Sequence, residues 1–216
     1  MNKMHPSKYI QYGCGHSAPD QWRNFDASPT LIFERLPIIG KLYTKNASRF
    51  PANVEFGDIV RGLPVPDGSC RGIYCSHVLE HLSLADFRLA IFNTYKALEN
   101  GGIFRLVLPD LEYLIKNYLD NSSSRASIEF LQEAALGHEF RQRGLKGIIF
   151  ACLGNSQHLW MWDYKSIFLE LKRVGFENIR RANFNDSSDS MFKAVEDQVR
   201  WENCLGVECQ KPFTTG

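Results

Sequence analysis

Short apolar stretches alternate with longer amphipathic segments along this chain. Apolar runs bounded by turn residues predict strands, and apolar residues at helical spacing predict helices. The predicted strands are residues 8–12, 23–26, 54–56, 72–76, 103–108, 178–184 and 204–209, and the predicted helical segments are residues 31–43, 83–98, 111–119, 127–136 and 163–174. Strands that alternate with helices indicate an α/β domain whose mainly parallel sheet is covered on both faces.

Composition narrows the class of protein. A chain of 216 residues with 44% hydrophobic and 23% charged residues suits one globular domain. Lys and Arg number 25 against 24 Asp and Glu, so the formal net charge is only +1. This balance supplies no electrostatic argument for nucleic acid or an anionic membrane as the main partner.

The six cysteines show no C-x-x-C spacing, which argues against a zinc ribbon or a thioredoxin-like site. The polar N-terminal residues 1–8 lack the apolar core of a signal peptide. Free thiols in the reducing cytoplasm are therefore the simplest expectation. No apolar run is long enough to span a bilayer.

A glycine turn follows the first predicted strand. Gly13-Cys14-Gly15, with Ala18, satisfies the G-x-G-x-x-A dinucleotide pattern. Two features oppose an NAD-linked enzyme. Pro19 interrupts the expected phosphate-facing helix, and Asp26 precedes the usual acidic position about 20 residues after the glycines. A tight turn with an acid close behind it better suits a ligand without a pyrophosphate.

A series of motifs along most of the chain carries a family resemblance through its order and spacing. The motifs are residues 8–15, 22–29, 57–59, 63–67, 74–82, 98–102, 105–110, 175–179 and 207–212. Together they resemble the predicted S-adenosylmethionine-dependent methyltransferases of class I. The resemblance implies a Rossmann-like, doubly wound, mostly parallel seven-stranded sheet with the last strand antiparallel. It also implies one domain over residues 1–216, with a substrate-side insertion at about 111–162.

The resemblance also implies a cofactor site for S-adenosylmethionine. Gly13 and Gly15 would lie beneath its methionine part, and Asp26 would accept hydrogen bonds from the ribose hydroxyls. Asp58 and Ile59 would flank the adenine. The remaining residues assigned to this site are Tyr12, Cys14, Ser76 and His77. The alternatives are a cap or solvated turn for Asp26 and a simple turn residue for Asp58.

Residues 77–81 also match the H-x-x-E-H pattern of inverted zincins. On a helix, His77 and His81 would share a metal ion while Glu80 activated water, with Glu133 or Glu139 as a conceivable third ligand. This zinc hydrolase is the less favoured alternative, because the surrounding chain matches the methyltransferase pattern, in which no metal ligand is assigned.

The candidate catalytic groups are His77, just after the fourth predicted strand, and Asp110, at the end of the fifth. A base is needed only where the acceptor must lose a proton, and His138 and His158 are further candidates. The alternatives are a structural histidine at His77 and a helix N-cap at Asp110.

The resulting expectation is methyl transfer to a small-molecule or saccharide acceptor, with S-adenosylhomocysteine as the product. A catalytically inactive S-adenosylmethionine-binding protein of the same fold is the main alternative, and a homodimer is left open.

Overall fold

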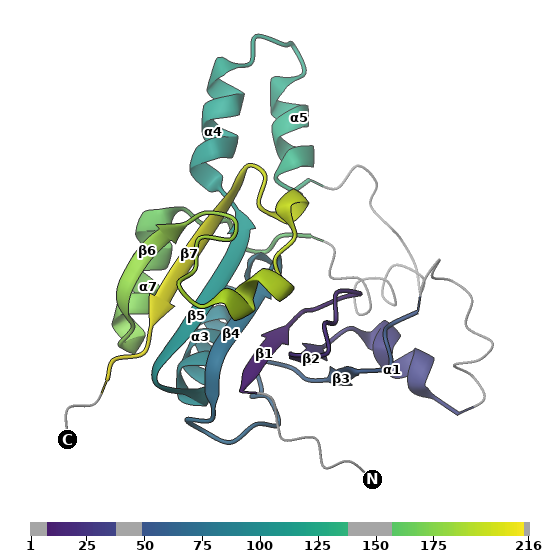
Figure 1. Ribbon diagram of the computed structural model, residues 1–216. Helices are drawn as coiled ribbons and strands as arrows, with labels where there is room; N and C mark the ends of the chain where they lie inside the picture. The colour runs from purple at the N-terminus through teal and green to yellow at the C-terminus, as the bar shows by residue number, and fades with distance from the viewer. Residues whose placement is uncertain (1–7, 38–48, 138–156, 214–216) are drawn as a thin grey trace.

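A seven-stranded sheet in the order β3-β2-β1-β4-β5-β7-β6 organises the chain (Figure 1). The computed structural model describes residues 8–37, 49–137 and 157–213. The strands are β1 (Tyr9–Tyr12), β2 (Arg23–Asp26), β3 (Val54–Phe56), β4 (Cys70–Ser76), β5 (Leu98–Pro109), β6 (Glu177–Ala182) and β7 (Cys204–Gln210). Strand β7 is antiparallel to β5 and β6, and the remaining pairs are parallel. The predicted fold class is therefore confirmed.

Side-chain caps define most of the helices between these strands. The helices are α1 (Pro29–Arg35), α3 (Leu84–Ala97), α4 (Leu111–Asp120), α5 (Ala126–Glu133) and α7 (Tyr164–Val174). The hydroxyl of Ser83 accepts a hydrogen bond from the backbone N–H of Asp86 and so caps α3. Helix α7 ends at Gly175 with a φ of 110°. Residues 38–43 of the predicted first helical segment lie outside the described residues.

Strand β5 begins earlier than the sequence predicts. Helix α3 ends at Ala97 and the strand starts at Leu98, so Asn100, Gly101 and Gly102 lie within the strand instead of between the two elements. Gly101 has a φ of 78°, and the register with β4 shifts near this point. The glycines therefore mark an irregular strand start.

The two faces of the sheet bury different kinds of side chain. One face packs against α3 and α7 through an apolar core that includes Ile73, Phe87, Phe104 and Ile167. The other face is covered by the segment between β6 and β7, which forms the short 3-10 helices η2 (Ser190–Ala194) and η3 (Gln198–Arg200). The expected cover on both faces is present, and irregular chain supplies it on the second face.

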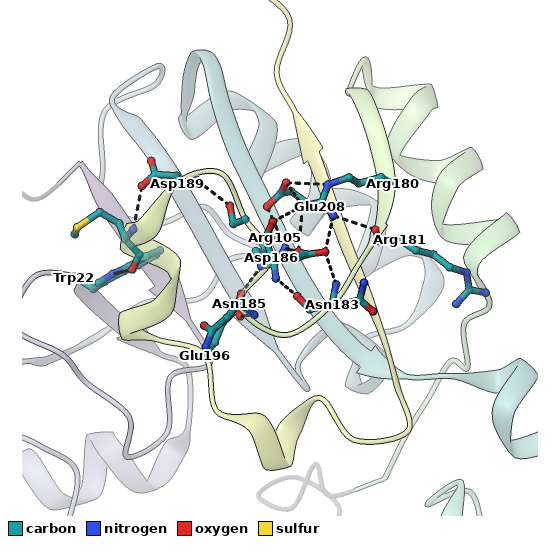
Figure 2. A network of polar contacts seen from close by, with 12 residues as sticks. Trp22, Arg105, Arg180, Arg181, Asn183, Asn185, Asp186, Asp189, Glu196 and Glu208 are labelled. Carbon is teal, nitrogen blue, oxygen red and sulfur yellow. Dashed lines mark hydrogen bonds and ion pairs between the residues drawn. The ribbon is translucent and has the colours of Figure 1, made fainter.

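A buried arginine lies on this second face. Successive strand residues point to opposite faces, so Arg105 of β5 faces away from α3 and has 0% exposure. Its guanidinium pairs with Glu196, with Asp186 at 2.9 Å and with Glu208 at 3.1 Å (Figure 2). The Arg105 guanidinium carbon also lies 4.6 Å from the centroid of the Trp201 ring. This network joins the cover segment to the sheet.

We expect Asp186 to make the fold sensitive to acid. Partial burial opposes its ionisation, but Arg180, the N–H of Asn183 and Arg105 outweigh burial and hold the pKa of this carboxyl well below its usual range. A pKa below the unfolded value of about 4 stabilises the fold above that pH, and the stabilisation is lost as the pH falls. Urea unfolding of Asp186→Asn should show a smaller stability loss between pH 7 and about pH 3 than the wild type.

The matched control for this acid test is Asp120→Asn, because Asp120 is an exposed carboxyl at the end of α4. This variant should keep the wild-type pH dependence. Equal losses in the wild type and Asp186→Asn would contradict the role given to Asp186.

The topology reverses direction between β1 and β4, which are neighbours at the centre of the sheet. Open parallel sheets bind ligands at such a point, beyond the carboxyl ends of the strands. Helices α4 and α5 stand side by side beyond the carboxyl end of β5 (Figure 1). Among the described residues, no helix combines the length and apolar character needed to cross a bilayer.

Candidate functional site

The turn after β1 contains two glycines in the left-handed region. Gly13 has a φ of 65° and Gly15 a φ of 54°. A Cβ atom on Gly13 would lie 2.1 Å from Cγ2 of Val78, whereas one on Gly15 would meet no atom within 4 Å. The backbone at Gly13 therefore lies close to the loop after β4, whereas open space lies beside Gly15.

Asp26 ends β2 beside this turn and is 8% exposed. Its Oδ2 atom accepts a hydrogen bond from the backbone N–H of Gly15 at 2.9 Å, and Oδ1 accepts one from Ser28 at 2.7 Å. Ser28, and not Asp26, caps helix α1. Each carboxylate oxygen keeps a further acceptor position, so the turn orients Asp26 without using its full hydrogen-bonding capacity.

Asp58 and Ile59 lie in the turn after β3. Oδ1 of Asp58 accepts a hydrogen bond from Val60 at 2.9 Å, and Oδ2 lies 3.4 Å from Nε of Arg61. The Ile59 carbonyl accepts a hydrogen bond from Asn93 of α3 at 2.8 Å. The turn role of Asp58 is thus observed, while the adenine contacts of both residues stay a prediction.

The side chains of Tyr12 and Cys14 point into the protein. The Tyr12 ring stacks near Phe104, and its hydroxyl lies 3.2 Å from the Thr94 hydroxyl. Cys14 packs beside Leu31, and burial, with the charge of Asp26, raises the pKa of its thiol to about 12. These side chains therefore do not face the turn. Contacts between the cofactor and the backbone of Tyr12 and Cys14 stay a prediction.

Ser76 ends β4 and is covered by an arginine from η3. The hydroxyl of Ser76 accepts a hydrogen bond from Nε of Arg200 at 3.0 Å, and its carbonyl accepts one from Nη2 at 2.7 Å. No local sequence signal points to this contact, because Ser76 and Arg200 are 124 positions apart. Arg200 therefore joins the cover segment to the carboxyl end of β4.

His77 has a strained backbone, with a φ of 55°. Its Nε2 atom lies 3.0 Å from the Arg200 carbonyl, and Nδ1 lies 3.3 Å from Oε1 of Glu80. Burial opposes protonation of the ring, but contacts with Cys204, Glu80 and the Arg200 carbonyl outweigh it and raise the pKa of His77 to about 10. At neutral pH this ring is an imidazolium, which cannot accept a proton.

Asp110 caps α4, as the alternative interpretation of its role expects. Its Oδ1 atom accepts a hydrogen bond from the N–H of Glu112 at 2.9 Å, and Oδ2 receives one from Arg181 at 3.3 Å. Both oxygens are thus engaged by structural partners. Its catalytic role stays a prediction.

The segment after residue 156 crosses over the loop that follows β4. The backbone N–H groups of Leu159 and Trp160 both donate to the Glu80 carbonyl, at 2.7 and 3.1 Å. Trp162 is buried, and its ring centroid lies 4.1 Å from that of Phe87, so it packs in the core. Trp160 is 42% exposed, and its ring centroid lies 6.1 Å from that of Trp162. His138 lies outside the described residues.

This crossing brings His158 to Glu80 and His81. One potential ligand atom from each of the three side chains lies within 4.8 Å of the others. Glu80 and His81 belong to the 3-10 helix η1 (Leu79–His81), so His77 and His81 do not share an α-helix as the zincin pattern supposes. Burial lowers the pKa of His158 and favours its neutral form. The third ligand expected from the sequence was Glu133 or Glu139, whereas the structure brings His158 to this position.

No protein-family model and no curated protein sequence matches this chain. Among solved structures, an S-adenosylmethionine-dependent methyltransferase from Methanosarcina mazei is 13% identical, with a TM-score of 0.50 over 95% of this chain and 92% of the other. A second solved structure is a chain from the complex between the Haloferax volcanii Trm112 methyltransferase activator and the putative methyltransferase. It is 12% identical, with a TM-score of 0.51 over 96% of this chain and 83% of the other.

The chain has the fold of the class I methyltransferases. At this level of identity the similarity concerns the fold alone. The class I fold brings the glycine turn, Asp26 and Ser76 to the carboxyl edge of one sheet, since each follows or ends a parallel strand.

Proposed function

We propose that this protein binds S-adenosylmethionine at the carboxyl edge of the sheet and transfers its methyl group to a small-molecule or sugar-containing acceptor. The observation that carries this proposal is the 2.9 Å hydrogen bond from the Gly15 N–H to the Asp26 carboxylate. It holds a buried carboxylate against the glycine turn, beside the open space at Gly15. Two hydroxyl groups of a ribose suit the remaining acceptor positions of that carboxylate.

The same contact disfavours a pyrophosphate ligand. Dinucleotide sites present free backbone N–H groups to the phosphates. Here Asp26 already takes the N–H of Gly15, and its negative charge would repel a phosphate. A sulfonium carries a positive charge, so the same carboxylate attracts it. The charge at this turn therefore supports S-adenosylmethionine over NAD.

The sulfonium supplies a methyl group that is already activated towards nucleophiles. The task of the protein is then to align the acceptor with the methyl carbon and to exclude water. Arg200 covers Ser76 at the end of β4, and residues 157–162 cross the neighbouring loop. We propose that these segments enclose the acceptor side of the site.

The state of the two candidate bases bears on the choice of acceptor. His77 is protonated at neutral pH, so it cannot act as the base. Asp110 accepts one hydrogen bond on each oxygen, from the N–H of Glu112 and from Arg181, and keeps further acceptor positions. The loss of His77 as a base favours an acceptor whose attacking atom need not lose a proton before it is methylated. It also favours the second candidate function, a catalytically inactive S-adenosylmethionine-binding protein. Transfer of labelled methyl groups into a mixed cell extract separates these two functions.

Calorimetry with S-adenosylmethionine, S-adenosylhomocysteine and NAD tests the ligand class. We expect the first two to bind and NAD not to bind. Asp26→Ala should weaken S-adenosylmethionine binding by about 1–3 kcal/mol, because it removes charge-assisted hydrogen bonds to the ligand. Asp26→Asn keeps the side-chain volume and separates loss of charge from loss of shape.

The control for this series is Asp67→Ala, which removes a carboxylate that is 70% exposed and paired with Lys96. Its affinity for S-adenosylmethionine should equal that of the wild type. Binding of NAD in place of S-adenosylmethionine would reject the proposal. Unchanged affinity in a folded Asp26→Ala variant would remove Asp26 from the site.

A further inference from the structure

We propose that Glu80, His81 and His158 form a binding site for a divalent transition-metal ion. Their potential ligand atoms lie within 4.8 Å of one another. They come from the 3-10 helix after β4 and from the segment that crosses it. The proposal goes beyond methyl transfer and does not depend on it, because metal binding is measured without the methyl donor.

The Glu80 carboxylate supplies the first argument. Glu80 is 1% exposed, and neither of its oxygens has a hydrogen-bond partner. Nδ1 of His77 lies 3.3 Å from Oε1, outside hydrogen-bonding geometry, and Nε2 of His158 lies 4.0 Å away. The His77 imidazolium lies beside Oε1, but neither Glu80 oxygen accepts a hydrogen bond, and a buried carboxylate whose hydrogen-bonding capacity is unused is costly. A metal ion between Glu80 and the two imidazoles would bind one of these oxygens directly.

The orientation of the two imidazoles supplies the second argument. Nδ1 of His81 lies 3.0 Å from the Gln157 carbonyl, and Nδ1 of His158 lies 2.8 Å from the Ala134 carbonyl. A carbonyl only accepts, so each Nδ1 carries the proton and the lone pair of the neutral ring resides on Nε2. Metal-binding histidines are commonly held in this way, by a carbonyl behind the ring. The two rings meet edge to face, with centroids 5.0 Å apart.

The donor set indicates the class of metal. Two imidazoles and one carboxylate suit Zn²⁺, Co²⁺ or Fe²⁺, whereas Ca²⁺ and Mg²⁺ prefer oxygen ligands. Bonds of about 2.0–2.2 Å require the side chains to move closer together on binding. Three protein ligands leave a coordination position open, as in sites that bind water or a substrate oxygen. The site lies next to His77, at the carboxyl edge of the sheet.

Titration of the full chain, first stripped with a chelator, tests the proposal. Calorimetry should show one Zn²⁺ ion bound per chain. Glu80→Gln and His158→Ala should each weaken this binding at least about tenfold. Glu80→Gln keeps the volume of the side chain, so loss of the fold does not confound it. His16→Ala removes an exposed histidine elsewhere and should bind Zn²⁺ as the wild type does.

Two further measurements separate this site from binding by the cysteines. Zn²⁺ should raise the melting temperature of the wild type but not that of Glu80→Gln, since a ligand stabilises only a fold that binds it. The Co²⁺ spectrum should show visible bands without a thiolate charge-transfer band. No Zn²⁺ binding, equal binding in Glu80→Gln, or a thiolate band would each overturn the proposal. Binding of S-adenosylmethionine is unaffected by these outcomes, so the two proposals fail separately.

Discussion

Replacing Arg105 with Met should lower the free energy of unfolding by about 3–5 kcal/mol. Arg105 has 0% exposure and pairs with three carboxylates, of which Glu196 is also fully buried. Removing one partner of a buried ion pair leaves the other charge buried and uncompensated, which is why the loss exceeds that of a surface pair. Urea unfolding at neutral pH measures the difference.

The matched comparison is Arg180→Met, in the same network. The Arg180 side chain is 40% exposed and reaches Asp186 and Glu208 from the solvent side. Surface pairs contribute at most about 1 kcal/mol, so this variant should be much less destabilised. Adding Glu196→Gln to Arg105→Met should recover part of the loss, because it removes the unpaired charge. A loss below about 1 kcal/mol for Arg105→Met would show that water or another cation compensates these carboxylates.

The strands and the glycine turn could be predicted because their signals are local. Alternating or continuous apolar runs located all seven strands. The pair of glycines after residue 12 predicted a sharp turn, and both have a positive φ. The start of β5 was predicted too late, because Asn100-Gly101-Gly102 carries the same local signal as a helix end.

The buried charges could not be predicted in this way. Arg105 looks in sequence like an exposed residue of a half-solvated strand, and only the cover segment between β6 and β7 makes it buried. The meeting of Glu80 with His158 depends on a chain crossing between residues 78 positions apart. Local patterns identify residues that end strands, whereas contacts between distant loops are set by tertiary packing.

The structure also changes how the candidate site is understood. The sequence offered His77 and Asp110 as proton acceptors. The structure shows His77 beside the Arg200 carbonyl and Asp110 as the cap of α4, and their catalytic roles stay a prediction. Asp26, in contrast, lies against the glycine turn as a ligand-binding carboxylate should. The binding half of the site is therefore better supported than the catalytic half, and cofactor binding is the first property to measure.

Gly13→Ala should be the most damaging single change in the glycine turn. An alanine at a φ of 65° costs about 1–2 kcal/mol, and its Cβ would lie 2.1 Å from Cγ2 of Val78. Overpacking adds about 1–3 kcal/mol. We expect a total loss of about 2–5 kcal/mol in urea unfolding. Because relief of the clash displaces the turn from Asp26, binding of S-adenosylmethionine should weaken as well.

Gly15→Ala separates these two causes. Its φ of 54° carries the same backbone strain, but its Cβ meets no atom within 4 Å, so only about 1–2 kcal/mol of stability should be lost. The new methyl group enters the open space of the proposed cofactor site, so ligand affinity should fall more than stability does. Adding Val78→Ala to Gly13→Ala removes the clash. The double variant should therefore recover the stability lost to overpacking, but not the stability lost to backbone strain at residue 13. If Gly13→Ala and Gly15→Ala lose equal stability, the contact with Val78 does not determine the shape of the turn.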